Sequence, residues 1–320
     1  MYSLLFARLA LPPGPVKSSR FCSIVNRSIG KASISLLVDD LSNLTQLCDV
    51  LKSSAPPAPV GVFIEVNVGQ DRGGVTPTAN NLPTILDIAK RATEREEVEY
   101  RGLHCYHGLL QHVGDTKNRS EMCRDNSVKC AQVVDEYLSK KGLKSPLITG
   151  GGTGTYAIEA SMGVHNEVQP GSFLLGDTQY GDVGMNAEEP EFEHAMWIHS
   201  AVASTVSTGG RVVIDAGSKA VDLVSGPPSL TDQGKGMGMN GDRDEGVGFT
   251  SGGDEHGILT FEGERVTPGL GETVRMLPRH IDPNCNLFDW FVAVEEGEGG
   301  NIEEGRIKGA WRITGRGVGC

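Results

Sequence analysis

Apolar and polar residues alternate along the first half of the chain in two repeating patterns. Short apolar runs rich in β-branched residues are each followed by a longer segment whose apolar residues recur at helical spacing. The strand-like runs are residues 33–38, 61–68, 101–107, 146–149 and 166–175. Strand and helix in regular succession predict βα units and a parallel sheet.

The ends of these predicted strands carry glycines and polar residues, in the segments NVGQDRGG, YHGLLQH, GGGTGTY and QPGSF. In a βα barrel the carboxyl ends of the strands build the active site, so this clustering favours a TIM-type barrel. Such a barrel has eight strands, whereas the sequence offers the five runs above and one further candidate, SLLFARLAL, near the N-terminus. We therefore expect an α/β fold with an incomplete (βα)8 barrel.

The pattern changes after about residue 188. Residues 193–217 read as two strands around a Gly-Gly turn, and short alternating segments continue to a final strand within residues 305–317. Residues 225–253, dominated by Gly, Ser, Asp and Pro, are expected to form a long loop. The predicted domains are therefore a barrel over residues 1–188 and a β domain over residues 189–320.

The charge, hydropathy and cysteines of the chain exclude some classes of protein. The net charge is −12 without any basic block, which disfavours nucleic acid because its phosphate backbone is also anionic. No apolar run reaches the roughly 18 residues of a membrane span. The seven cysteines include no C-x-x-C pair, so reduced thiols in a cytoplasmic protein are expected rather than a disulfide framework.

The N-terminal segment leaves a second location open. No acidic residue precedes Asp39, and basic residues punctuate a serine-containing stretch, which is the composition of a mitochondrial transit peptide. Pro12 and Pro13 would break the amphipathic helix that such a peptide needs. A strand followed by a turn explains the segment better, and a mitochondrial location remains the alternative.

The segment GGGTGTY, residues 150–156, follows a predicted strand and precedes a predicted helix. Glycines in this position let backbone N–H groups approach an anion, and the threonine hydroxyls add further donors. The lysine of a P-loop is absent, and so is the acidic residue that follows a dinucleotide fingerprint. A phosphate cradle is favoured over a flexible turn.

Two further strand ends carry candidate chemistry. Arg72, in DRGG, is either a solvated charge or an oxyanion contact at the mouth of the barrel. The segment HCYHGLLQH brings three histidines together, and His107 is the one best placed at a strand end to act as a general base. A surface histidine without function is the alternative for His107.

His280 and Asp282 form the last candidate group, in LPRHIDPNCN. In an extended segment residues i and i+2 share a face, so the imidazole and the carboxylate can converge on one ion. Two ligands leave coordination positions open, as catalytic metal sites do. The mixed nitrogen and oxygen pair suits Mn, Mg, Co or Zn, and a loop histidine beside a turn aspartate is the alternative.

Taken together, the segments FIEVNVGQDRGGV, GLHCYHG, GGGTGTY, EVQPGSF, VVIDAGSKA, DEHG and LPRHIDPNCN resemble the D-threonine aldolase and D-serine dehydratase family. The order of these segments along nearly the whole chain is more specific than any single one. The resemblance implies pyridoxal phosphate in an alanine racemase-type barrel and a following β domain that carries a divalent metal. It also implies a D-amino acid substrate and a homodimer.

The resemblance assigns roles to individual residues. Arg72 would contact the phenolic oxygen of the cofactor, and His107 would lie beside the cofactor. The phosphate would be bound by Gly152, Thr153, Gly154, Thr155, Gly171, Ser172 and Tyr180. The β domain would contribute Asp254 as a catalytic residue, with Glu255 and His256 beside it, and His280 with Asp282 as the metal pair.

The metal pair also points to one branch of the family. The dehydratase branch typically shows His-x-Cys, whereas His-x-Asp looks like the aldolase branch, and a carboxylate suits manganese or magnesium. The implied reaction is retro-aldol cleavage of a D-3-hydroxy amino acid to glycine and an aldehyde, with His107 as the base. D-serine dehydration, or a relative that binds pyridoxal phosphate or metal without turnover, are the alternatives.

One element of the family pattern is not found. Family members bind the cofactor covalently through a lysine in an Arg-Pro-His-x-Lys-Thr-like segment on the first barrel strand, and these 320 residues contain no such segment. SLLFARLAL resembles the third strand of the family, which leaves about two of the eight strands unaccounted for. An incomplete barrel exposes unpaired strand edges, and we expect the chain as given to be inactive or weakly active.

Overall fold

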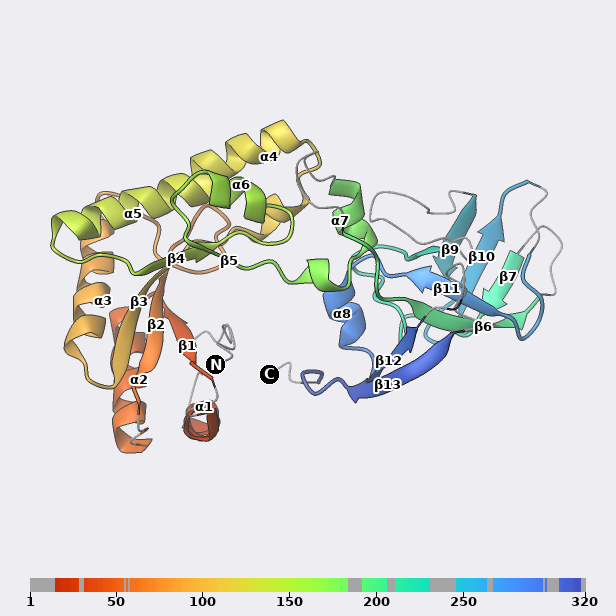
Figure 1. Cartoon of the computed structure of the whole chain (residues 1–320), viewed down its shortest axis with the longest axis horizontal. Helices are drawn as coiled ribbons and strands as arrows, with labels where there is room; N and C mark the ends of the chain where they lie inside the picture. The colour runs from red at the N-terminus through yellow and green to blue at the C-terminus, as the bar shows by residue number, and fades with distance from the viewer. Residues whose placement is uncertain are drawn as a thin grey trace. The chain divides into compact units, whose positions relative to one another are not determined.

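The computed structural model divides the chain into two compact units, Met1–Pro170 and Gly171–Cys320 (Figure 1). The structure describes residues 15–28, 32–54, 56, 58–183, 192–205, 211–230, 246–263, 267–295, 297 and 305–317. The division between the units falls at Pro170. The domain boundary predicted after residue 188 stays a prediction.

The first unit is built on a parallel sheet. Its strands are β1 Ser35–Val38, β2 Val60–Glu65, β3 Val98–His104, β4 Leu147–Gly150 and β5 Glu167–Val168. They neighbour one another in chain order, which confirms the five strands predicted from the alternation. The pairing of β3 is irregular beside Gly102, whose φ is +130° and whose added Cβ would lie 1.8 Å from the carbonyl oxygen of Leu147. Only glycine fits there.

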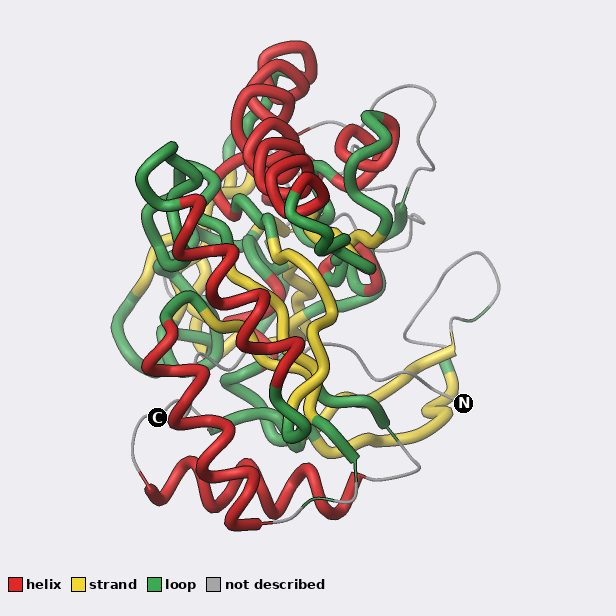
Figure 2. Tube along the Cα trace, turned by 90° about the vertical axis from the view of Figure 1, so that its left-hand side faces the viewer, coloured by secondary structure: helices red, strands yellow, loops and turns green. Residues whose placement is uncertain are grey.

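Helices connect these strands: α1 Pro15–Ser28, α2 Leu41–Ser54, α3 Leu82–Glu94, α4 Thr116–Cys123, α5 Lys129–Lys140 and α6 Tyr156–Ser161. Helices α1, α2, α3 and α5 lie side by side in that order, and Figure 2 views the unit from the side of these helices (red), outside the strands (yellow). Helix α3 buries Ile85, Ile88, Ala89 and Ala92, which recur every three or four residues. Burial of such faces against the sheet forms the core of the unit.

Helix α1 was missed in the sequence-based prediction. Its residues Phe21, Cys22 and Val25 fall on one helical face and are buried, but that face continues at Ser18 and Ser28, so the apolar pattern is short. The run SLLFARLAL, predicted as a strand, lies outside the described residues. The π-helical turn η2 Arg124–Val128 joins α4 to α5, and the 3-10 turn η1 Gly108–His112 follows β3.

The second unit is mainly antiparallel. Its six-stranded sheet has the order β8-β11-β6-β7-β10-β9, and β12 and β13 form a separate ribbon. The strands are β6 Ile198–Ser204, β7 Arg211–Ile214, β8 Ser229–Leu230, β9 Val247–Ser251, β10 Gly257–Phe261, β11 Thr273–Leu277, β12 Trp290–Glu295 and β13 Arg306–Arg312. The edge strands β8 and β9 approach each other, so the sheet curls into a barrel-like form. The predicted β domain is thus confirmed.

The long loop predicted over residues 225–253 was wrong in part, because β8 and β9 lie within it. Strand β9 pairs along its whole length with β10, and its Val247 and Phe249 pack against the core of this unit. The glycines around them hide a strand from composition alone. Among the described residues no helix is both long and apolar enough to cross a bilayer, and the six described cysteines carry free thiols.

Candidate functional site

A layer of buried and partly buried polar side chains crosses the carboxyl ends of β2 to β5 in the first unit. The imidazole of His104 pairs through Nδ1 with the carboxylate of Glu65, and its Nε2 lies 3.3 Å from Oε1 of Gln169. Gln169 in turn donates from Nε2 to Oγ1 of Thr149 over 2.8 Å. These contacts fix His104 in the floor of the strand-end region.

His107 lies beyond the end of β3, since the strand stops at His104 rather than at residue 107 as predicted. The strands that pair with β3, namely β2 and β4, end at Glu65 and Gly150. After His107 the chain turns into η1. The side chain of His107 is buried, and its Nδ1 has no hydrogen-bond partner among the described residues. Burial, with a smaller contribution from the charge of Arg72, lowers the pKa of His107. A neutral imidazole in this position can accept a proton.

Arg72 is exposed at the end of an ordered loop that follows β2. The side-chain oxygen of Asn67 accepts hydrogen bonds from the backbone N–H groups of Gly69 and Asp71, over 3.0 and 3.2 Å. These bonds hold the loop, and the guanidinium carbon of Arg72 lies 5.7 Å from the centre of the Tyr106 ring. The cation, the aromatic ring and the imidazole of His107 therefore belong to one cluster.

The glycine turn between β4 and α6 is buried and is bound by Gln111. The backbone N–H of Gly154 donates to Oε1 of Gln111 over 3.0 Å, and Nε2 of Gln111 donates to Oγ1 of Thr155 over 2.9 Å. A Cβ on Gly154 would lie 2.1 Å from the carbonyl oxygen of Gln111. Gly154 is therefore required in part because η1 approaches the turn closely. The sequence did not predict that Gln111 binds this turn. The buried hydroxyls of Thr153 and Thr155 flank the same turn.

Glu159 lies beneath the glycine turn on helix α6. Its side chain is buried, it accepts a hydrogen bond from the hydroxyl of Ser127, and a Cβ on Gly151 would lie 2.9 Å from its Oε2. Burial raises the pKa of Glu159 to about 7. The acid therefore changes charge in the neutral range.

In the second unit the side chains of His280 and Asp282 lie close together, but by a backbone route that differs from the predicted one. His280 is extended and precedes the short helix α8 Ile281–Cys285, within which Asp282 lies. The expectation of one extended segment was wrong, yet Nε2 of His280 and Oδ2 of Asp282 are 3.2 Å apart. Across the residues that the structure describes, no group of three or more His, Cys, Asp or Glu side chains could hold a metal. The pair alone supplies two donor atoms.

Asp177 supports this pair from the other side. Its Oδ2 lies 3.1 Å from Nδ1 of His280 and accepts a hydrogen bond from the backbone N–H of Ile281. The hydrogen bond with Asp177 is the main cause that raises the pKa of His280. Sequence reasoning missed Asp177, which lies 103 residues from His280 in the chain.

Two residues predicted for the cofactor phosphate lie beside the predicted metal pair. The hydroxyl of Ser172 is 3.3 Å from Oδ2 of Asp282, and the ring of Tyr180 is centred 6.5 Å from that of His280. Gly171 is exposed and directly precedes the turn η3 Ser172–Leu174. The helix α7 Thr178–Val183 carries Tyr180.

The segment Asp254–Glu255–His256 forms the exposed turn between β9 and β10. Asp254 accepts a hydrogen bond from the hydroxyl of Ser218 over 3.2 Å, and Glu255 forms an ion pair with Lys219. These contacts tie the turn to the segment that follows β7. The catalytic role of Asp254 stays a prediction.

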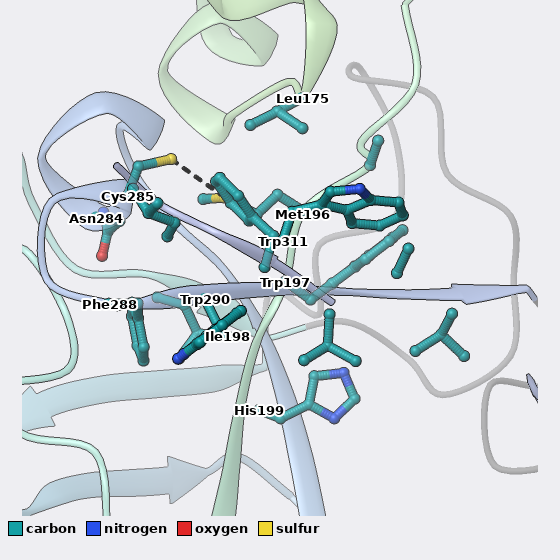
Figure 3. Close-up of a pocket in the computed structure, with 16 residues that line it drawn as sticks. Leu175, Met196, Trp197, Ile198, His199, Asn284, Cys285, Phe288, Trp290 and Trp311 are labelled. Atoms are coloured by element: carbon teal, nitrogen blue, oxygen red, sulfur yellow. Dashed lines mark hydrogen bonds between the residues drawn. The ribbon is translucent and has the colours of Figure 1, made fainter. Parts of the chain in front are cut away.

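An apolar cavity of about 710 Å³ lies on the far end of α8 from His280, within the second unit. All three tryptophans of the chain, Trp197, Trp290 and Trp311, line it, and the thiol of Cys285 donates to the sulfur of Met196 at its wall (Figure 3). Apolar residues dominate the lining, so the cavity offers little for proton transfer or metal binding.

Comparison with known proteins supports the motif-based resemblance. Residues 195–294 match the family model described as "Putative serine dehydratase domain", and residues 25–179 match "Alanine racemase, N-terminal domain". The chain is similar to the D-threonine aldolase of Arthrobacter sp, at 33% identity over 288 residues, 89% of this chain and 68% of that protein. It is 29% identical over 292 residues to the 3-hydroxy-D-aspartate aldolase of Paracoccus denitrificans (strain Pd 1222), covering 90% and 68%.

A solved structure agrees with these sequence matches. The D-threonine aldolase from Filomicrobium marinum superposes with a TM-score of 0.82 at 28% identity, over 96% of this chain and 75% of that one. The fold, the order of the two domains and the sequence identity all agree with the resemblance carried by the motifs. The chain therefore belongs to the D-threonine aldolase and D-serine dehydratase-like family, with an alanine racemase-type N-terminal domain.

Proposed function

We propose that the protein is a lyase that depends on pyridoxal phosphate and a divalent metal and acts on D-3-hydroxy amino acids, most like D-threonine aldolase. The observation that carries the proposal is the His280–Asp282 pair, whose nitrogen and oxygen donors lie 3.2 Å apart. Similarity to two aldolases of D-3-hydroxy amino acids supports the substrate class. Retro-aldol cleavage would give glycine and an aldehyde.

The strand-end cluster of the first unit fits pyridoxal phosphate. Arg72 offers a cation for the phenolic oxygen, and His107 offers a buried Nδ1 that has no partner among the described residues. The turn from Gly152 to Thr155 would hold the phosphate, and binding at the Gly154 N–H requires Gln111 to release it. When bound, the cofactor supplies an electron-accepting ring that stabilises negative charge at the substrate Cα. His107, uncharged at neutral pH, would take the proton of the substrate hydroxyl.

The second-unit pair fits a hard or borderline divalent cation. A neutral imidazole and a carboxylate are donors that Mn²⁺, Mg²⁺, Co²⁺ and Zn²⁺ accept, and two protein ligands leave positions open for water and substrate. Such a cation lowers the pKa of a hydroxyl bound to it. Asp282 in place of a cysteine favours the aldolase over the dehydratase reaction, with D-serine dehydration as the alternative.

A non-catalytic role is a second candidate function, because no described lysine is placed to bind the cofactor covalently. Of the lysines that the structure describes, all but Lys17 are exposed, and none lies at the carboxyl end of β1 to β5. Covalent attachment of the cofactor needs a lysine amine in the site. This chain would then bind the phosphate or the metal with little or no turnover.

One set of measurements separates these functions. D-threonine is incubated with the chain, pyridoxal phosphate and Mn²⁺, and acetaldehyde and glycine are quantified; D-serine is assayed in parallel for pyruvate and ammonia. Aldehyde release supports the lyase proposal, and pyruvate release alone would replace it with the dehydratase. Borohydride reduction followed by peptide mapping tests the lysine argument, since one stoichiometrically modified lysine would contradict it.

A further inference from the structure

The side chain of Asp177 is fully buried, and each of its oxygens has a defined donor. Oδ1 accepts from the backbone N–H of Tyr180 over 2.9 Å, which caps the start of α7. Oδ2 accepts from the backbone N–H of Ile281 over 3.2 Å and lies 3.1 Å from Nδ1 of His280. The carboxylate therefore bridges two segments that lie far apart in the sequence.

The two segments are also joined through their backbones. The N–H groups of Thr178 and Gln179 donate to the carbonyl oxygens of Pro278 and Arg279, over 3.2 and 3.1 Å. Arg279 returns a hydrogen bond from Nη1 to the carbonyl oxygen of Thr178 over 3.0 Å. Because these bonds flank Asp177 and His280, they hold the two backbone segments together and keep both side chains within reach of each other.

This arrangement decides which imidazole nitrogen of His280 carries the proton. A carboxylate accepts hydrogen bonds but cannot donate, so Asp177 favours the form of His280 that carries a proton on Nδ1. Asp282 is also a carboxylate, but its side chain is 69% exposed, so water screens its attraction for a proton on Nε2, whereas Asp177 is fully buried. The lone pair of the neutral ring then lies on Nε2, the atom that faces Asp282. Histidine ligands of metals commonly donate their other N–H to a carboxylate, which fixes the ring and makes it a stronger ligand.

We propose that Asp177 is the positioning residue for His280: it holds the imidazole in the tautomer and orientation that present Nε2, together with Asp282, to a divalent cation. This inference rests on the metal pair of the proposed function. Ser172 has the matching task on the other ligand, since its hydroxyl lies 3.3 Å from Oδ2 of Asp282. The result is a two-ligand centre whose donor atoms are oriented before the cation arrives.

The test replaces Asp177 by asparagine and measures Mn²⁺ affinity by calorimetry. In Asp177→Asn an amide NH₂ must face an N–H donor, either that of Tyr180 or that of His280, so the tautomer or the cap is lost. We expect Mn²⁺ binding to weaken about 10- to 100-fold. The matched control is Asp222→Asn, because Asp222 adds negative charge near His280 without bonding to its ring. The control should change the affinity by less than about threefold.

A second readout needs neither the metal nor a folded variant. Nitrogen-15 NMR of the metal-free wild-type chain, at a pH where His280 is neutral, should place the ring proton on Nδ1. A proton on Nε2, or equal losses of affinity in Asp177→Asn and Asp222→Asn, would overturn the inference. If wild-type chain binds no Mn²⁺ while the proton is on Nδ1, the metal part of the proposed function fails and the positioning role of Asp177 stands.

Discussion

His107 in the first unit and His280 in the second have pKa values that are shifted in opposite directions by different causes. In the first unit His107 is buried with its Nδ1 unpartnered among the described residues, and burial lowers its pKa. In the second unit His280 is held between Asp177 and Asp282, and the hydrogen bond with Asp177 raises its pKa. Burial disfavours the charged ring, whereas a carboxylate favours it. The first arrangement suits a proton acceptor, and the second suits a site for a cation.

The largest effect is expected from removal of a metal ligand. His280→Ala and Asp282→Ala each delete one of the two donors, so Mn²⁺ affinity measured by calorimetry should fall more than about 100-fold, beyond the loss typical of a supporting residue. His107→Ala should leave that affinity unchanged, since His107 is not one of the two donors. A comparable loss in His107→Ala would break the distinction between the two histidines.

The next effect tests whether burial sets the pKa of an acidic side chain in the first unit. Burial raises the pKa of Glu159 from 4.5 to about 7. The folded chain therefore binds a proton that the unfolded chain has lost between about pH 4.5 and 7, and stability falls as the pH rises through this window. Relative to Glu159→Gln, wild-type chain should lose up to about 3 kcal/mol of unfolding free energy between pH 4.5 and 8.

Urea unfolding at pH 5 and pH 8 measures this difference, and the glutamine variant serves as the reference without a titrating group. Cys123 also faces Glu159, but burial raises its pKa to about 12, so it stays neutral over the range. If the unfolding free energies of the two chains depend on pH in parallel, solvent reaches Glu159 and burial does not raise its pKa.

A smaller effect is expected from a change in the chemistry of the metal pair. Asp282→Cys replaces a hard oxygen by a soft thiolate, which zinc accepts far better than manganese. The ratio of Zn²⁺ to Mn²⁺ affinity should rise by about tenfold or more. Competition titrations on wild-type and variant chains give this ratio directly. An unchanged ratio would refute Asp282 as a ligand and with it the assignment to the aldolase branch.

The sequence predicted most of the fold because the relevant patterns are local. The five strands of the first unit follow from β-branched runs, and the segments that carry Arg72, His107 and the glycine turn follow β2, β3 and β4 in the chain. Strand β9 was missed because glycines surround its few apolar residues, and their partner strand β10 supplies the pairing that makes them a strand. Helix α1 was missed because its apolar face is short and ends at Ser18 and Ser28.

The buried polar residues that hold the candidate site residues in place could not be predicted in the same way. Asp177, Gln111 and Glu159 are polar residues of a kind that usually faces water, and nothing in their neighbours distinguishes them from surface positions. Each is buried by segments that lie far away in the chain, Asp177 against His280 and Gln111 against the turn around Gly154. Such pairings depend on the tertiary fold, so only the structure shows them.

The smallest expected effect concerns Arg72 and His107. Burial is the main cause of the lowered pKa of His107, and the charge of Arg72 adds to it. Arg72 is exposed, so water and salt screen its charge. Arg72→Met should therefore raise the pKa of His107 by less than about one unit, and the shift should shrink as salt is added. An NMR titration of the imidazole measures both, and His280 serves as the internal control because its pKa should not move. A fall in the pKa of His107, or a rise that brings it to the value of a free histidine, would show that burial is not the dominant influence in the first unit.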